Sequence, residues 1–157
     1  MTARTNAKDA GEIAARQAAF SVLSHAAPDE LKRLWEEAGL PSEAPMLRGP
    51  EIGLVTLRGR IGGGGAPFNF GEATVTRATV RLPDGSVGHS YALGRDKEKA
   101  KLAAIADALW QNPARRAEVE AKILGPLRAT AASAEEKRRA ETAATKVDFF
   151  TMVRGED

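Results

Sequence analysis

The first apolar pattern along the chain has the period of a helix. Apolar residues recur at helical spacing over about Ala7 to Ala27, which predicts one helix. A second helix is predicted to begin at Pro28, to carry two acidic residues in its first turn, and to end at Gly39. Residues 1–40 are therefore expected to form a helical hairpin.

The middle of the chain changes to a strand pattern. Val, Ile, Leu, Thr and Tyr are frequent in Ile52–Ile61, Glu72–Leu82 and Val87–Leu93, and the Asp84-Gly85 pair between the last two segments is a strong hairpin signal. Residues 51–94 are therefore expected to form an antiparallel meander of about three to four strands. The prolines before this region predict an extended connector over residues 40–50.

Helical spacing returns after the predicted sheet. Asp96 is positioned to cap a helix that runs to about Gln111. Pro113 and Pro126 are each expected to open a further helix, and a capping box begins at Ser133. Residues 96–145 are therefore expected to be helical.

Together these patterns predict an α+β fold. The N-terminal helical hairpin and the C-terminal helices are expected to pack on the antiparallel β-meander, within a single domain over residues 1–157. At this length the chain is long enough to bury a core without disulfides or metals. The high alanine content predicts helices that pack closely through small side chains.

Residues 146–157 form an apolar end that is unusual for a terminus. Chain termini normally fray in water, so a terminus rich in apolar residues is expected to dock, either in the chain's own sheet or on another chain. This docking tail supplies a candidate partner interface: Phe149, Phe150, Met152, Val153 and Arg154.

A glycine-rich segment, RGRIGGGGAPFNFGEATVTR, spans residues 58–77. Ordering four consecutive glycines costs much conformational entropy, so a fold that orders them uses positive φ angles or close backbone approach. Backbone N–H groups in such a turn can form an anion nest, and arginines can add charge. The candidates for an anion or triphosphate site, or for an interface, are Arg58, Arg60, Gly62, Gly63, Gly64, Gly65 and Arg77.

The same segment has a plainer interpretation. It matches neither a P-loop, which needs GK[ST] and a following helix, nor a dinucleotide-binding fingerprint. The glycines then form a flexible hairpin loop or a tight corner. The arginines then lie on the solvated face of a half-exposed sheet, paired with Glu51, Glu72 or Asp84.

The sequence contains no self-evident catalytic or metal site. There are no cysteines, which excludes disulfides, iron–sulfur ligation, thiolate zinc and a cysteine nucleophile within this chain. His25 and His89 have no neighbours at metal-ligand spacing, and each lies next to a serine only along the chain. Asp107 is either an exposed helix residue or a functional acid. No catalytic residue is identified, and no metal is expected.

Charge and hydropathy narrow the class of protein. The formal net charge is only +2, with basic and acidic residues interspersed, so nucleic-acid binding is not demanded. No segment reaches the length of a membrane span, and the first residues lack the apolar core of a signal peptide. We expect a soluble cytoplasmic protein without nucleic-acid or membrane partners.

Several motifs resemble the PhnG family of bacterial phosphonate metabolism. They are LRGPEIGLV at 47–55, the glycine-rich segment at 58–77, Gly88-His89, LGRD at 93–96, and ATKVDFFTMVRGE at 144–156. The resemblance covers about residue 48 to the C-terminus, in the expected order. It implies a subunit of the carbon–phosphorus lyase core complex, in which PhnG assembles with PhnH, PhnI and PhnJ.

The resemblance also implies a reaction. PhnI, with PhnG, PhnH and PhnL, transfers the ribose triphosphate of MgATP to a phosphonate such as methylphosphonate, and adenine leaves. The product is α-D-ribose 1-methylphosphonate 5-triphosphate. PhnJ later cleaves the carbon–phosphorus bond with S-adenosylmethionine and an iron–sulfur cluster.

Within that scheme the present chain suits a supporting subunit that binds no cofactor alone. A hetero-oligomer is expected, and homodimerisation is left open. The alternative is a stand-alone anion-binding or nucleotide-binding module that uses the glycine loop at 62–65.

Overall fold

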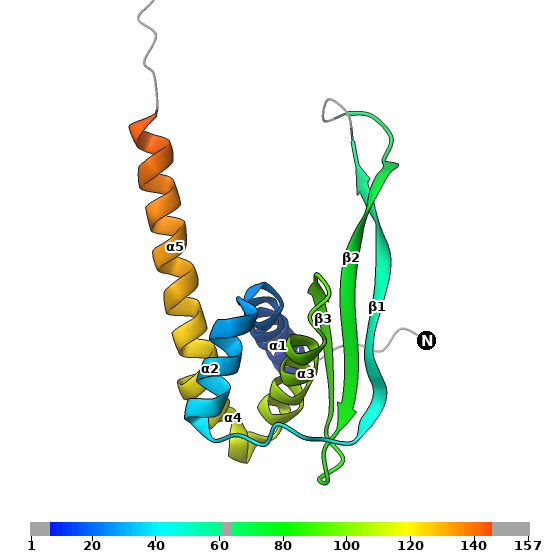
Figure 1. Cartoon of the computed structure of the whole chain (residues 1–157), viewed down its shortest axis with the longest axis vertical. Coiled ribbons are helices and arrows are strands. Elements are labelled where there is room, and N and C mark those ends of the chain that lie inside the picture. Colours follow the sequence, from blue (N-terminus) through cyan, green and yellow to red (C-terminus); the bar gives the residue numbers. More distant parts are fainter. Residues whose placement is uncertain (1–6, 61–63, 146–157) are drawn as a thin grey trace, which may run out of the picture.

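The computed structural model describes residues 7–60 and 64–145 and has an α+β fold, as expected from the sequence (Figure 1). Two helices come first and three strands follow, and the remaining elements are helical. In chain order the elements are α1 (Ala7–His25), α2 (Pro28–Ala38), β1 (Met46–Gly59), β2 (Phe68–Arg81), β3 (Val87–Leu93), α3 (Lys97–Gln111), α4 (Pro113–Val119), the π-helical turn η1 (Glu120–Leu124) and α5 (Gly125–Ala144).

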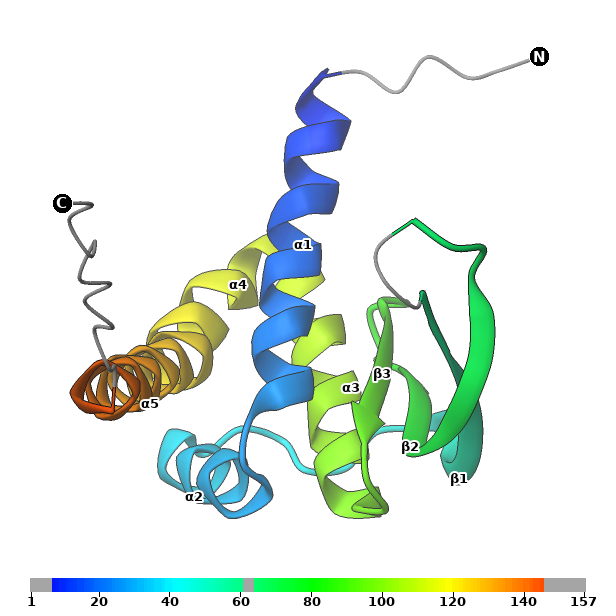
Figure 2. The same ribbon diagram turned by 90° about the horizontal axis from the view of Figure 1, so that it is seen from above.

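The three strands form one antiparallel sheet in the order β1-β2-β3, and the helices lie on one of its faces (Figure 2). Alternation along each strand sends every second side chain toward those helices. The buried residues of β2 and β3 are the ones that face them, with the exception of Val75: Thr76, Ala78, Val80, Gly88, Ser90 and Ala92. None of the helices in the described part of the chain lies on the opposite face of the sheet (Figure 2).

The core depends on a close approach between β3 and α3. A Cβ atom placed on Gly88 would lie 2.0 Å from the carbonyl oxygen of Ala104 and 2.7 Å from Cβ of Ala108. Real Cβ atoms do not come so near, so only glycine fits at this position. Ala104 and Ala108 are both fully buried, in agreement with the close packing expected from the alanine content.

The helix ends follow the signals in the sequence. Gly39 caps α2 with a φ of 64°, in the left-handed region that favours glycine. The Asp96 carboxylate accepts a hydrogen bond from the Lys99 backbone N–H at 2.7 Å and so caps α3. The Lys99 ammonium group in turn donates to the carbonyl of Ser24 at the end of α1, at 2.8 Å. Burial lowers the pKa of Lys99.

The first strand begins earlier than the sequence suggested. β1 starts at Met46 rather than near Ile52, so part of the expected connector belongs to the sheet and Pro50 lies inside a strand. Only β2 flanks β1, and an edge strand tolerates a residue without an N–H group. The pairing register shifts between Arg48 and Glu51, around this proline. The boundaries expected at Ile61 and Glu72 are likewise wrong: β1 ends at Gly59 and β2 starts at Phe68.

The last helices run on from one another. α4 passes through the π-turn η1 directly into α5, and the Gly125 N–H donates to the Glu120 carbonyl at the junction. Pro126 lies in the first turn of α5, as expected. The capping box at Ser133 is wrong, because Ser133 lies in the middle of α5. There the backbone N–H groups already have partners one turn earlier, and no cap is needed.

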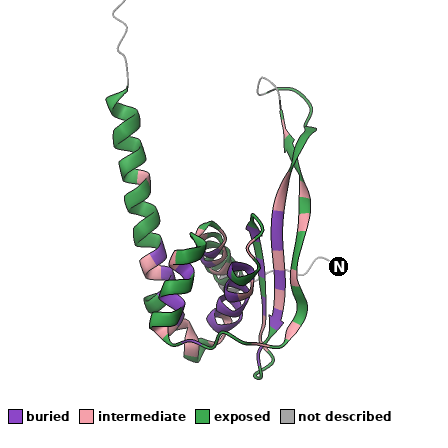
Figure 3. Ribbon diagram, viewed as in Figure 1, coloured by how far each residue is buried: buried purple, intermediate pink, exposed green. Residues whose placement is uncertain are grey.

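Two segments extend beyond the packed body (Figure 1). β3 ends opposite Val75, so residues 54–59 of β1 and 68–74 of β2 project as a two-stranded hairpin arm. Residues 128–144 of α5 project as a helical arm, almost all of it exposed. Burial is concentrated in α3 and in the parts of β2 and β3 that contact it (Figure 3).

Replacing Gly88 tests the close approach of β3 and α3. Gly88→Ala is expected to lower the free energy of unfolding by about 3 kcal/mol, because the new methyl group overlaps the backbone of α3. Urea denaturation followed by circular dichroism measures the change. Gly53→Ala is the matched control, since no atom lies within 4 Å of the added Cβ, and a change within about 0.5 kcal/mol is expected. Equal stability of the two variants would contradict the packing described.

Candidate functional site

The glycine-rich segment lies at the tip of the hairpin arm. Arg60 follows the last residue of β1, and Gly64 and Gly65 lie in an exposed turn before β2. Gly62 and Gly63 lie outside the described residues. Arg58 is the last charged residue inside β1 and pairs with Asn69 of β2.

The structure does not bring Arg77 to this tip. Arg77 pairs across the strands with Glu51, whereas Arg58 pairs with Asn69. Asn69 and Arg77 are eight positions apart along β2, a separation of about 26 Å. A single anion therefore does not bridge Arg77 and the glycine turn.

Arg77 instead belongs to a surface ion-pair cluster. Glu51 accepts hydrogen bonds from Nε of Arg48 at 2.8 Å and from Nε of Arg77 at 3.3 Å. The bond from Arg48 is the main cause of the lowered pKa of Glu51. For Arg77 the plainer expectation, an arginine paired with Glu51 on a solvated face, is confirmed.

Arg58 and Arg60 are placed differently. Neither makes an ion pair with a carboxylate among residues 7–60 and 64–145. Both side chains are positioned near the tip, where the only acidic residue of the arm is Glu72. The tip therefore carries excess positive charge.

Large apolar side chains are exposed along the hairpin arm and beside it. The Phe70 ring covers Gly59, where an added Cβ would lie 3.0 Å from the ring, and the ring centroids of Phe68 and Phe70 are 6.3 Å apart. The arm thus combines apolar groups with a cationic tip, which is typical of interfaces rather than of free surfaces. The exposed apolar residues of this region are Ile52, Leu54, Leu57, Phe68, Phe70, Tyr91 and Leu93.

The proposed interface residues of the tail, Phe149, Phe150, Met152, Val153 and Arg154, lie outside the described residues. The helix that leads to them is the helical arm, which ends at Ala144. Their role stays a prediction.

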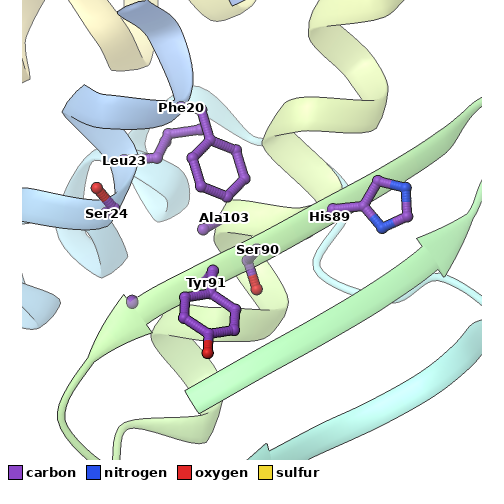
Figure 4. A pocket seen from close by; sticks show the side chains of 8 residues that line it. Phe20, Leu23, Ser24, His89, Ser90, Tyr91 and Ala103 are labelled. Atoms are coloured by element: carbon purple, nitrogen blue, oxygen red, sulfur yellow. The ribbon is translucent and has the colours of Figure 1, made fainter. Parts of the chain in front are cut away.

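Of the two serine–histidine neighbours, Ser24 and His25 lie within hydrogen-bond distance, with Oγ 3.2 Å from Nδ1, whereas the side chains of His89 and Ser90 point to opposite faces of β3 (Figure 4). Ser90 faces α3, whereas His89 points to the other face of β3, where its Nδ1 lies 3.2 Å from Oγ1 of Thr79 (Figure 4). The residues around Ser90, which include Phe20 and Ala103, leave no room for a water molecule. Nδ1 of His25 lies 2.8 Å from the Ser21 carbonyl oxygen of the same helix.

Metal and membrane features are equally absent from the part of the chain that the structure describes. There, no group of three or more His, Asp or Glu residues is placed to hold a metal ion. No described helix has the length and apolar character needed to cross a bilayer.

Comparison with known proteins gives one consistent result. The family model of the phosphonate metabolism protein PhnG matches residues 14–155. The chain belongs to the PhnG family. A protein of Rhizobium meliloti (strain 1021), described as alpha-D-ribose 1-methylphosphonate 5-triphosphate synthase subunit PhnG, is 54% identical over 158 residues. That match covers 100% of this chain and 99% of the relative, so the expected family resemblance is confirmed.

A buried ion pair is the polar feature that the sequence pattern of this PhnG-family chain did not reveal. Asp107 lies on α3 with only 3% of its surface exposed. Arg16 of α1 donates to both of its oxygens, from Nε at 2.9 Å and from Nη2 at 2.7 Å. The bond to Asp107 raises the pKa of Arg16.

Asp107 also reaches the sheet. Its Oδ2 accepts the backbone N–H of His89 at 2.9 Å, and Gln111, one turn later on α3, donates to the carbonyl of Val87 at 2.8 Å. Both backbone groups point away from β2, along the outer edge of β3. Asp107 is therefore a buried acid that joins α1, α3 and β3, and the expectation of an exposed helix residue is wrong. The sequence did contain a signal for this burial: Asp107 is the one polar residue in the apolar run from Ala103 to Leu109.

Asp107→Asn is expected to lower the free energy of unfolding by about 2 kcal/mol, because Arg16 loses its charged partner while staying half-buried. Thermal and urea denaturation measure the effect. Glu98→Gln makes the same chemical change at an exposed position of α3 and is expected to change stability by less than about 0.5 kcal/mol. If both variants behave alike, the ion pair has no structural role.

Proposed function

We propose that this chain is the PhnG subunit of an α-D-ribose 1-methylphosphonate 5-triphosphate synthase. The observation that carries the proposal is the match to the Rhizobium meliloti subunit over the full length of both chains. In the proposed reaction an oxygen of the phosphonate attacks the anomeric carbon of MgATP. The glycosidic C–N bond breaks, a C–O bond forms, and adenine leaves.

The proposed role is supporting rather than catalytic. The described residues offer no acid–base pair in a cavity: both histidines have local hydrogen-bond partners, and Asp107 is occupied by Arg16. The proposed partners are PhnI-like, PhnH-like, PhnJ-like and PhnL-like proteins in the cytoplasm. Because this chain has no cysteine, the iron–sulfur cluster and S-adenosylmethionine of the later cleavage step are proposed to belong to another subunit.

The two arms support a role in assembly. Soluble monomers rarely expose contiguous apolar surface, and most of the stability of a protein helix comes from tertiary packing, which the exposed helical arm lacks within the described residues. Both features are explained if partner subunits cover the arms. The hairpin arm supplies exposed aromatic residues, Phe68 and Phe70, and aromatic residues are enriched in interfaces.

Removal of the tail tests the proposed assembly. A chain ending at Thr145 is expected to lose co-purification with co-expressed PhnI-like, PhnH-like and PhnJ-like subunits, because the apolar tail is proposed to bind them. Its circular dichroism spectrum should stay that of a folded protein, since all buried core residues of the described part of the chain lie at or before Leu127.

Point variants refine that experiment. The double variant Phe149→Ala/Phe150→Ala should reproduce the loss, whereas the control Lys146→Ala/Thr151→Ala should not. Recovery of the intact complex with the truncated chain would reject the tail as an interface.

A second candidate, direct binding of a triphosphate at the tip of the hairpin arm, is favoured by the excess positive charge there. Arg60→Ala in the assembled complex should then weaken MgATP binding by about 1.5 to 3 kcal/mol, the scale of a hydrogen bond to a charged group. Isothermal titration calorimetry measures the affinity, with Arg33→Ala on the exposed side of α2 as the control. Unchanged affinity in the Arg60 variant excludes that residue, and binding by the isolated chain would instead favour a stand-alone module.

A further inference from the structure

Along the outer edge of β1, backbone groups have no hydrogen-bond partner among the described residues. The Arg81 N–H donates to the Pro45 carbonyl and the Gly94 N–H donates to the Thr74 carbonyl, both at 2.9 Å. Odd-numbered residues of β2 therefore bond toward β1, and even-numbered residues bond toward β3. The residues of β1 that pair with even-numbered positions point their N–H and C=O groups away from the sheet. In the regular stretch between the last two register shifts of β1, they are Ile52, Leu54 and Thr56.

The side chains at these positions are also uncovered. Ile52 and Leu54 face the helix-bearing side of the sheet, but the helices do not extend over them, and they are 46% and 62% exposed. Between Glu51 and Arg58 the strand contains no charge and no proline. Native edge strands normally carry such residues, which prevent another strand from pairing with them.

The opposite edge of the sheet shows the contrast. On β3 the outward N–H of His89 bonds to Asp107, and the outward carbonyl of Val87 bonds to Gln111. The fold thus closes part of one edge with side chains of α3 and leaves the regular stretch of the other edge open.

The charged residues at the two ends of the open stretch of β1 indicate which kind of strand can pair with it. At one end Glu51 already accepts bonds from Arg48 and Arg77. At the other end Arg58 has no carboxylate partner among the described residues. A complementary strand is therefore apolar at its centre and carries a carboxylate where it passes Arg58.

A second copy of this chain does not offer that carboxylate. In a symmetric antiparallel pair centred on Leu54, Arg58 faces Pro50 of the other copy. The nearest acidic residue there is Glu51, which is already bonded to two arginines. The charge pattern favours a different chain.

We propose that an extended segment of a partner subunit adds to β1 as a fourth strand of the sheet, with its backbone bonded to Ile52, Leu54 and Thr56 and an acidic side chain against Arg58. This inference rests on the proposed function, since the partner is another subunit of the synthase. Strand addition uses main-chain hydrogen bonds for affinity and neighbouring side chains for specificity.

Residue-resolved amide hydrogen exchange tests the proposal. The chain is compared alone and in the complex purified after co-expression with PhnI-like, PhnH-like and PhnJ-like subunits. The amides of Ile52, Leu54 and Thr56 should exchange at least about tenfold more slowly in the complex. Those of Gly53 and Val55 point toward β2, are protected already, and serve as internal controls. This alternating pattern distinguishes strand addition from contact through side chains alone.

Charge reversal gives an independent readout. Arg58→Glu should weaken assembly about tenfold or more, because like charges then meet at the added strand. Arg81→Glu, an exposed arginine outside the open stretch of β1, is the matched control and should assemble normally.

The possible results separate the two proposals. Assembly without slower exchange at the three amides overturns strand addition and leaves the proposed function intact. Slow exchange at these amides in the isolated chain, with sedimentation as a dimer, assigns the edge to a second copy and also overturns the proposal. Failure of the unaltered chain to assemble rejects the proposed function and the added strand together.

Discussion

The contact between Gly88 and the backbone of α3 sets the arrangement of the whole body. Because β3 lies directly against Ala104 and Ala108, the sheet and α3 pack closely with only small residues between them. That distance lets the Asp107 carboxylate reach the N–H of His89 while it holds Arg16. Apolar packing and the pairing of buried polar groups therefore depend on one glycine in β3, and α1 is held in place through the same acid.

The same arrangement makes the sheet asymmetric. Side chains of α3 bond to the outward groups of β3, but no element of residues 7–60 and 64–145 pairs with the outer edge of β1, where Ile52 and Leu54 are exposed. In a monomer, a free edge with apolar side chains promotes aggregation, because other strands can pair with it. In a subunit, the same edge can specify where a neighbouring chain pairs. The helical arm presents the same contrast, since its helix continues well past the last buried residue, Leu127. These uncovered surfaces agree with membership of the PhnG family, in which a 54% identical relative is described as a subunit of a synthase.

The arginines of the sheet are also distributed as expected for a subunit that binds partners through its hairpin arm. The arginines near the sheet divide into two groups: Arg48 and Arg77 are paired with Glu51, whereas Arg58 and Arg60 near the tip of the hairpin arm have no carboxylate partner among the described residues. The glycine-rich segment therefore belongs to a projecting tip rather than to an enclosed pocket. Its charge is available to a partner carboxylate or to a phosphate group.

The sequence by itself determined the α+β class and most element boundaries, because these depend on local signals such as helical spacing, the Asp96 cap, Gly39 and the Asp84-Gly85 turn. It also indicated the family, through the resemblance of motifs such as LRGPEIGLV and ATKVDFFTMVRGE. It missed the start of β1, because pairing along β2 outweighs the local preference of Pro50, and it misplaced a cap at Ser133, because a continuing helix supplies the backbone partners. Only the tertiary structure decided that Arg77 lies far from the tip, that Asp107 is buried, and that one sheet edge is open. Each of these depends on strand register and on contacts between residues distant in sequence, which no local pattern encodes.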